Sequence, residues 1–130
     1  MRISMKNDLD LIRAILEEVE SWEYANPNVV EVAGWPEHVV ARHVERLGKD
    51  GLLENSGQFI AGDFSDPAHL IVRDLTSRGH EFLGAIRSGD VLERLKSALK
   101  PSELAALSMG KLANLAGELA EQAIRKKLGL

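Results

Sequence analysis

The sequence contains no cysteine, no low-complexity tract and no long apolar run. Without cysteine there can be no disulfide, thiolate metal site or thiol nucleophile, which fits a reducing compartment. No apolar stretch approaches the roughly 20 residues that a membrane-spanning helix requires. The N-terminal stretch carries acidic residues within its apolar part, which a signal peptide would not. We therefore expect a cytoplasmic protein that has no membrane partner.

A surplus of positive charge is also missing. The chain has 16 Lys and Arg against 20 Asp and Glu, a net charge of -4. Many nucleic-acid-binding proteins are basic overall, so this balance counts against such a role, although a local basic patch could survive it. What is present is a chain of 130 residues with 45% hydrophobic content. This combination favours a folded domain with a real core.

Apolar periodicity predicts a mostly helical α+β fold. A first helix is expected over about 8–22, capped by Asn7 or Asp8, with a stripe that includes Leu9, Ile12 and Leu16. The valines in 29–32 suit a short strand. Further helices are expected from Pro36 to the residue before Gly51, over 77–88, over 91–99, and over 102–128, where 108–110 leaves room for a bend.

Several local signals mark the ends of elements in the middle of the chain. Gly51 suits the left-handed conformation that ends a helix, with Leu52 folding back onto Leu47. Two strands follow, separated by a turn at 66–67, and the second strand is expected over 69–75. Thr76 then suits the cap of the next helix. Gly79 lies on the inner face of that helix and would let it approach the sheet closely.

The motifs that mark common enzymes are absent. There is no glycine-rich phosphate loop and no nucleophile elbow. His38 and His43 are five residues apart, whereas zinc ligands on one helix are normally four apart. His80 and Leu75 occupy the two positions of a hydrophobic staple, which favours a structural role for His80. We therefore expect no enzymatic activity, no catalytic residue, no metal site and no cofactor.

The predicted order of helix, short strand, helix, two strands and helix is that of a winged helix. The stretch "VVARHVERLGKDGLL" resembles the recognition helix of winged-helix proteins, and "LTSRGHEFL" resembles the segment that follows the wing. One departure is that 24–35 is too short and too rich in proline and valine for a middle helix. The interpretation is a winged helix-turn-helix-like domain over 5–90 and a helical extension over 91–130 that packs on it or dimerises.

The chain also resembles, over almost all of 5–130, an uncharacterised family of small phage and prophage proteins. The resemblance is carried by "MKNDLDLIRAILEEVE", "HVERLGKDGLL", "RDLTSRGHEFLGAIRS" and the terminal "KKLGL". Val91 and Leu92 stand where that family commonly has an aromatic residue, which implies a small change in packing. The family has no established activity, so the resemblance implies a fold more than a function.

Two functions remain open at this point. In a DNA-binding winged helix, the exposed face of the second helix enters the major groove. Its candidates here are His38, Arg42, Arg46 and Lys49. Against this, Asp63 and Asp66 at the expected wing tip would be repelled by phosphates. The alternative is a protein-interaction module, and the alanine-rich C-terminal helix could pair with a second copy of itself.

Overall fold

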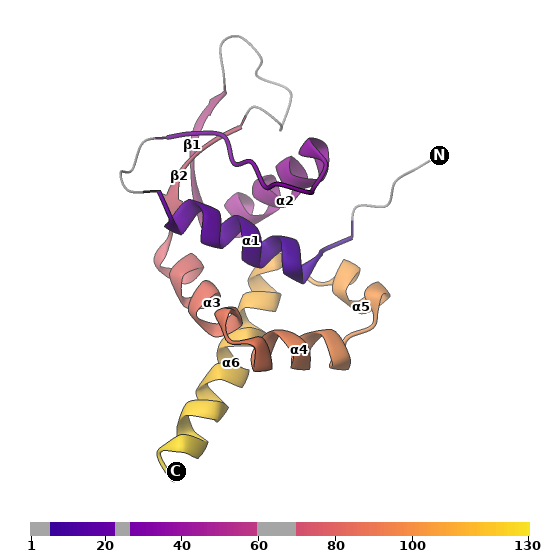
Figure 1. The fold of residues 1–130 in the computed structure, drawn as a ribbon, viewed down its shortest axis with the longest axis vertical. Coiled ribbons are helices and arrows are strands. Elements are labelled where there is room, and N and C mark those ends of the chain that lie inside the picture. Colours follow the sequence, from indigo (N-terminus) through magenta and orange to yellow (C-terminus); the bar gives the residue numbers. More distant parts are fainter. Residues whose placement is uncertain (1–5, 23–26, 60–69) are drawn as a thin grey trace.

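The computed structural model describes residues 6–22, 27–59 and 70–130, with side chains of 56–59 left aside. The described part is an α+β fold, mostly helical, with one two-stranded sheet (Figure 1). Its elements are α1 (Leu9–Glu20), α2 (Glu37–Lys49), β1 (Leu53–Phe59), β2 (Leu70–Leu75), α3 (Ser77–Arg87), α4 (Gly89–Ala98), α5 (Pro101–Ala106) and α6 (Met109–Lys127).

Helix α1 begins where its sequence signals predict. The carboxylate of Asp8 accepts hydrogen bonds from the backbone N–H groups of Asp10 and Leu11, at 3.0 and 3.1 Å. These bonds satisfy two of the donors that a helix N-terminus leaves without intrahelical partners. The apolar stripe of α1 is buried, as predicted: Leu9, Leu11, Ile12, Ile15, Leu16 and Val19. This stripe places α1 at the centre of the core.

Helix α2 ends in the motif that the sequence predicts. Gly51 has a φ of 76°, in the left-handed region. The N–H of Leu52 donates to the carbonyl of Leu47 (2.9 Å), and that of Gly51 donates to Gly48 (3.2 Å). This pair of bonds is the Schellman pattern, which satisfies carbonyls at the end of a helix. The prediction for Gly51 is confirmed, and the motif turns the chain directly into β1.

Strands β1 and β2 form an antiparallel pair, with Leu53 opposite Leu75 and irregular register farther along. The strand expected over 29–32 is reduced to an isolated bridge between Asn28 and Val72. Both backbone bonds of this bridge are present, at 2.9 and 2.8 Å. The expected turn at 66–67 lies outside the described residues. In the part of the chain that the structure describes, the segment before α2 therefore joins the hairpin by a single residue pair instead of a full strand.

The join between β2 and α3 confirms the predicted cap. The hydroxyl of Thr76 accepts from the N–H of Gly79 (3.0 Å) and donates to the carbonyl of Gly51. The N–H of Thr76 also donates to the carbonyl of Leu52 (3.2 Å). Thr76 thus caps α3 and fastens it to the end of α2. Gly79 is buried against the chain entering β1, as its position on the inner face predicts.

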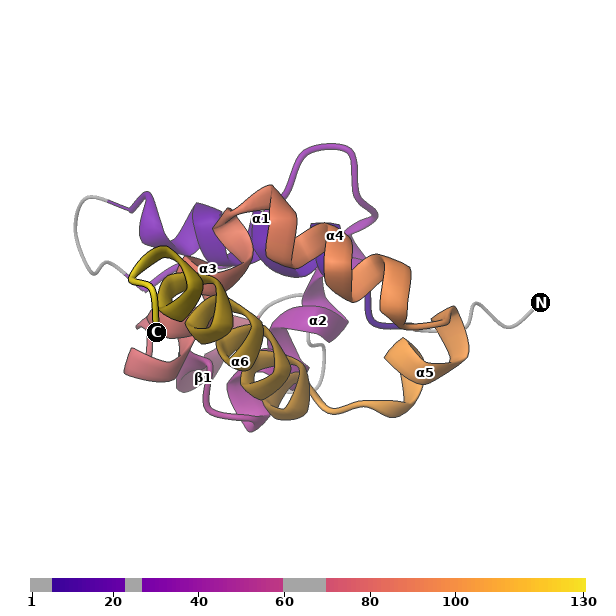
Figure 2. The same cartoon turned by 90° about the horizontal axis from the view of Figure 1, so that it is seen from below.

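The C-terminal region forms three helices. The helix expected over 102–128 is divided into α5 and α6, and the hydroxyl of Ser108 caps α6 by accepting from Lys111 N–H (3.1 Å). The first half of α6 packs on α3 and α4 through Met109, Leu112 and Ala116, which are buried. Its second half projects away from the other helices (Figure 1), and in the view from below α6 lies in front of them (Figure 2).

Candidate nucleic-acid interface

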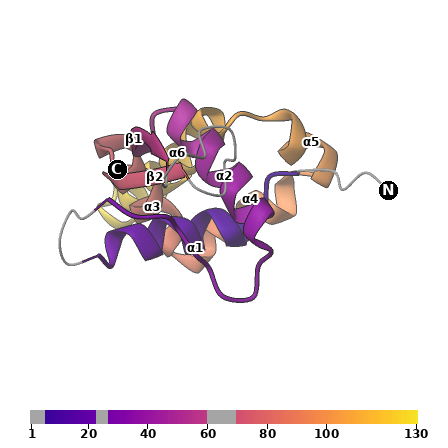
Figure 3. The same cartoon turned by 90° about the horizontal axis from the view of Figure 1, so that it is seen from above.

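Helix α2 lies beside the hairpin and over α1 (Figure 3), and its outer face carries the predicted candidates. His38, Arg42 and Lys49 are exposed on this face. Their spacings of four and seven residues place them along one side of the helix. Arg42 and Lys49 make no ion pair or hydrogen bond in the described part of the chain. The structure therefore brings three of the four candidates together on one accessible surface.

Acidic residues interrupt this surface. Glu37 is exposed at the start of α2, and Glu45 is half-exposed between Arg42 and Lys49. The face therefore carries two arginine or lysine charges against two glutamates. Asp63 and Asp66, the acidic residues expected at the wing tip, lie outside the described residues. The charge pattern of α2 gives local cations but no broad basic patch.

Arg46, the fourth candidate, differs from the others because it is only partly exposed and has a structural contact. Its Nη1 donates to the side-chain oxygen of Asn7 (3.2 Å). The amide nitrogen of Asn7 in turn donates to the carbonyls of Leu104 (2.8 Å) and Leu107 (2.7 Å). Asn7 is buried, so its polar atoms need these hydrogen bonds in place of bonds to water. Arg46 thus helps to join α2, the start of α1 and the end of α5.

His43 lies on the opposite side of α2 from the exposed candidates and is fully buried. Its Nδ1 lies 2.9 Å from the carbonyl of Val39, which can only accept, so Nδ1 carries the proton. Its Nε2 is then free to accept from the N–H of Asp8, at 3.1 Å. Burial is the main reason that the pKa of His43 is lowered. This neutral histidine links the start of α1 to the middle of α2.

The C-terminal end of α2 is held by a second polar cluster. The guanidinium of Arg78 donates to the carbonyls of Asp50 (3.1 Å) and Gly110 (3.3 Å) and to the side chain of Asn114 (3.1 Å). The carboxylate of Asp50 accepts from the N–H of Gly110 (3.2 Å). Because Gly110 and Asn114 belong to α6, the orientation of α2 depends in part on residues outside the predicted winged-helix segment.

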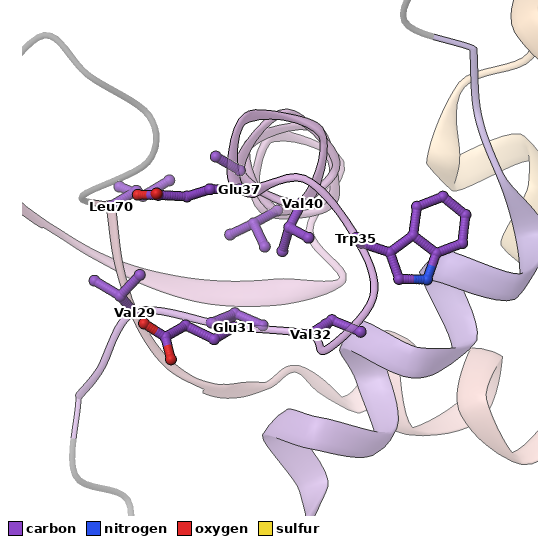
Figure 4. A pocket seen from close by; sticks show the side chains of 10 residues that line it. Val29, Glu31, Val32, Trp35, Glu37, Val40 and Leu70 are labelled. Carbon is purple, nitrogen blue, oxygen red and sulfur yellow. The ribbon is translucent and has the colours of Figure 1, made fainter.

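A pocket of about 210 Å³ lies between α2 and the segment that precedes it (Figure 4). Valine side chains, among them Val30, Val40 and Val44, form much of its wall, and Trp35 also contributes. The carboxylates of Glu31 and Glu37 are its charged lining groups. Within the described part of the chain, neither carboxylate forms a hydrogen bond or an ion pair.

The other positions singled out in the sequence are not assembled into a site. His80 is exposed, away from buried His43. Within residues 6–22, 27–59 and 70–130, no group of three or more His, Cys, Asp or Glu side chains could hold a metal ion. In the same ranges, no helix is both long and apolar enough to cross a bilayer. His43 and Asn7 were not expected as structural centres, because their partners are distant in sequence.

The fold defines a small, mostly helical α+β protein built around one hairpin. The family described as "Hypothetical protein (DUF2513)" matches residues 6–104, so the chain belongs to that family. An "Uncharacterized protein" of Haemophilus influenzae (strain ATCC 51907 / DSM 11121 / KW20 / Rd) is 36% identical over 104 residues, which are 77% of this chain and 83% of that protein. No solved structure matches. The family match ends before α6 begins.

Proposed function

We propose that the protein is a winged-helix-like DNA-binding regulator in which α2 enters the major groove. The observation that carries this proposal is the exposed pair Arg42 and Lys49, which have no partner in the described structure. Cationic side chains on one exposed helix face can contact phosphates, and arginine can also bind guanine with two hydrogen bonds. His38 extends the same face toward the start of α2.

The order of the elements supports this role. Helices α1 and α2 precede an antiparallel hairpin, and α3 follows it, so the hairpin occupies the place of a wing. The Schellman motif at Gly51 and the Thr76 cap fasten the hairpin to α2 and α3. The resemblance to phage and prophage proteins suggests a regulatory role in such a setting. This role implies a cytoplasmic, non-enzymatic protein.

Replacement of both Arg42 and Lys49 by alanine tests the proposal. Binding to a fluorescent duplex, followed by anisotropy, should weaken for every sequence tested. The slope of log affinity against log salt concentration should fall by about two units, because each phosphate contact contributes about 0.9. Unchanged affinity and slope would contradict the proposed interface.

The matched control removes two cations elsewhere. Arg94 and Lys100 are exposed near α4, which Figure 1 shows on the other side of α1 from α2. Their replacement by alanine changes the net charge by the same amount. If both double variants weaken binding equally, the effect comes from overall charge and not from α2. Arg46 is omitted from the test because its bond to Asn7 would mix binding with stability.

A second candidate is a protein-interaction module that does not bind DNA. It is favoured by α6, whose end carries the exposed apolar side chains Ile124, Leu128 and Leu130. Apolar groups gathered on one projecting segment are typical of a contact surface. Self-association through α6 is compatible with either function, because many DNA-binding proteins are dimers.

A further inference from the structure

The second half of α6 has an apolar side that nothing in the described structure covers. Residues 121–130 are all exposed. Ile124 and Leu128 retain 57% and 68% of their accessible surface, and together with Leu130 they are the exposed large hydrophobic residues of the described chain. Ile124 and Leu128 are four residues apart, so they lie on neighbouring turns of one side.

The same side of α6 has a groove nearer to its start. The groove runs between α3 and α6 and has a volume of about 330 Å³. Its α6 wall includes Ala113 and Gly117, and its α3 wall includes Phe82 and Glu81. A Cβ added at Gly117 would meet no atom within 4 Å, so the groove is open at this point. Small residues therefore stand at one end of this side, and large apolar residues stand at the other.

We propose that two copies of the chain pair through this side of α6, with the helices antiparallel. A two-fold axis near position 120 places Ile124 of each copy against Gly117 of the other. The same register places Leu128 against Ala113, because the position numbers of facing residues add to a constant in an antiparallel helix pair. The large side chains of one copy fill the groove of the other, and both contacts are equivalent by symmetry.

Charge complementarity supports a second copy as the occupant of the groove. The charged residues that line the groove are Glu81, Glu118 and Arg78. The guanidinium of Arg78 is held by two backbone carbonyls and by Asn114. Glu81 and Glu118 form no ion pair in the described part of the molecule.

The end of α6 carries three consecutive basic residues, Arg125, Lys126 and Lys127, of which Arg125 pairs with Glu121 of the same helix (3.2 Å). In the antiparallel register, the basic end of each copy lies beside the two unpaired carboxylates in the groove of the other. A parallel pairing would instead set the three basic residues of both copies together.

The antiparallel pairing gives a geometry to self-association through α6 and does not depend on DNA binding. Analytical ultracentrifugation without DNA, from about 1 to 200 μM, should show a dimer. Ile124→Glu should sediment as a monomer, because it places a charge in the contact between the two copies. The substitution should not disturb the fold of the monomer, since Ile124 is exposed there. Gln122→Glu adds the same charge on another side of α6 and should remain dimeric. A wild-type monomer throughout, or equal sedimentation of the two variants, would overturn the proposal.

A variant of Gly117 distinguishes the loss of the dimer contact from the loss of the folded monomer. Gly117→Gln should raise or preserve the melting temperature of the monomer, because its Cβ has room and glycine is a poor helix former. The same side chain would occupy the space that receives Ile124 of the second copy, so the dimer should be lost. Retention of the dimer by a folded Gly117→Gln protein would contradict the proposed contact.

The register can be measured with a single thiol, because the chain has no cysteine. In the proposed dimer, the two copies of position 120 lie almost opposite each other. Ala120→Cys should therefore form a covalent dimer under mild oxidation, seen on a non-reducing gel. Gln122→Cys, on another side of the helix, should form it far more slowly. The reverse order, or equal rates, would exclude this antiparallel register even if the protein is dimeric.

Discussion

Gly79 packs against the carbonyl group of Leu52 so closely that a Cβ on Gly79 would lie 2.0 Å from the carbonyl oxygen. The same oxygen accepts a hydrogen bond from the N–H of Thr76. The glycine is therefore required by the approach of α3 to the chain entering β1, and not by an unusual backbone angle. This contact explains why a glycine precedes His80 at the join between strand and helix.

Gly79→Ala should lower the free energy of unfolding by about 1–3 kcal/mol or more, the usual cost of forcing an extra methyl group into a packed region. The neighbouring atoms are backbone and cannot simply rotate away. Gly84→Ala on the same helix is the control, because Gly84 is exposed and its added Cβ would meet nothing within 4 Å. It should raise stability by about 1 kcal/mol. Urea denaturation of both variants checks the pair, and equal effects would refute the account of Gly79.

Stability should fall as the pH is lowered through the range below about 6.5, the pKa of an unperturbed histidine. Burial lowers the pKa of His43 in the folded state. In this pH range the unfolded chain therefore binds a proton more readily than the folded chain, which favours unfolding. A protonated Nε2 would also become a donor facing the N–H of Asp8. Arg46 nearby further lowers this pKa, while the carbonyl of Val39 and the carboxylate of Asp8 raise it.

Thermal denaturation between pH 7.5 and pH 5.5 measures this effect. His43→Gln should remove most of the pH dependence, although the variant is less stable at pH 7.5. The exposed His80 provides the control, and His80→Gln should keep the pH dependence and change stability by about 1 kcal/mol or less. A pH dependence that survives in His43→Gln would show that another group is responsible.

Asn7→Ala should cost about 1–3 kcal/mol, because it leaves the carbonyls of Leu104 and Leu107 without their donor. It also removes the acceptor for Arg46. Lys6→Ala, at the adjacent exposed position, should have little effect. Chemical denaturation compares the two. If Asn7→Ala is as stable as Lys6→Ala, the link between α1, α2 and α5 contributes little.

The sequence predicted those features that depend on neighbouring residues. The stripe of α1, the glycine after α2 and the Thr76 cap each have a local signal, and the structure confirms all three. The division of the last helix at Ser108 also had a signal, since serine is a favoured cap, but the interpretation allowed only a bend there. The strand expected from the valines in 29–32 was wrong in extent, since among the described residues Asn28 alone pairs with the hairpin.

Such local patterns do not predict contacts between residues that are far apart in the sequence. Asn7 binds carbonyls about one hundred residues away, and nothing in its local sequence indicates that distance. The bond between His43 and Asp8 likewise depends on how α1 crosses α2, which no local pattern indicates. For the same reason, the helix pattern grouped Arg46 with Arg42 and Lys49, whereas the fold gives Arg46 a partner in Asn7. The proposed role of the four candidates in DNA binding stays a prediction.

The most direct test of the proposed function is the affinity of the unmodified protein for random duplex DNA at a series of salt concentrations. We expect measurable binding at about 50 mM salt, where the electrostatic contribution is strong. Affinity should fall roughly tenfold by about 200 mM salt if Arg42 and Lys49 each contact a phosphate. An absence of binding at about 50 mM salt would contradict the DNA-binding proposal and favour a protein-interaction module.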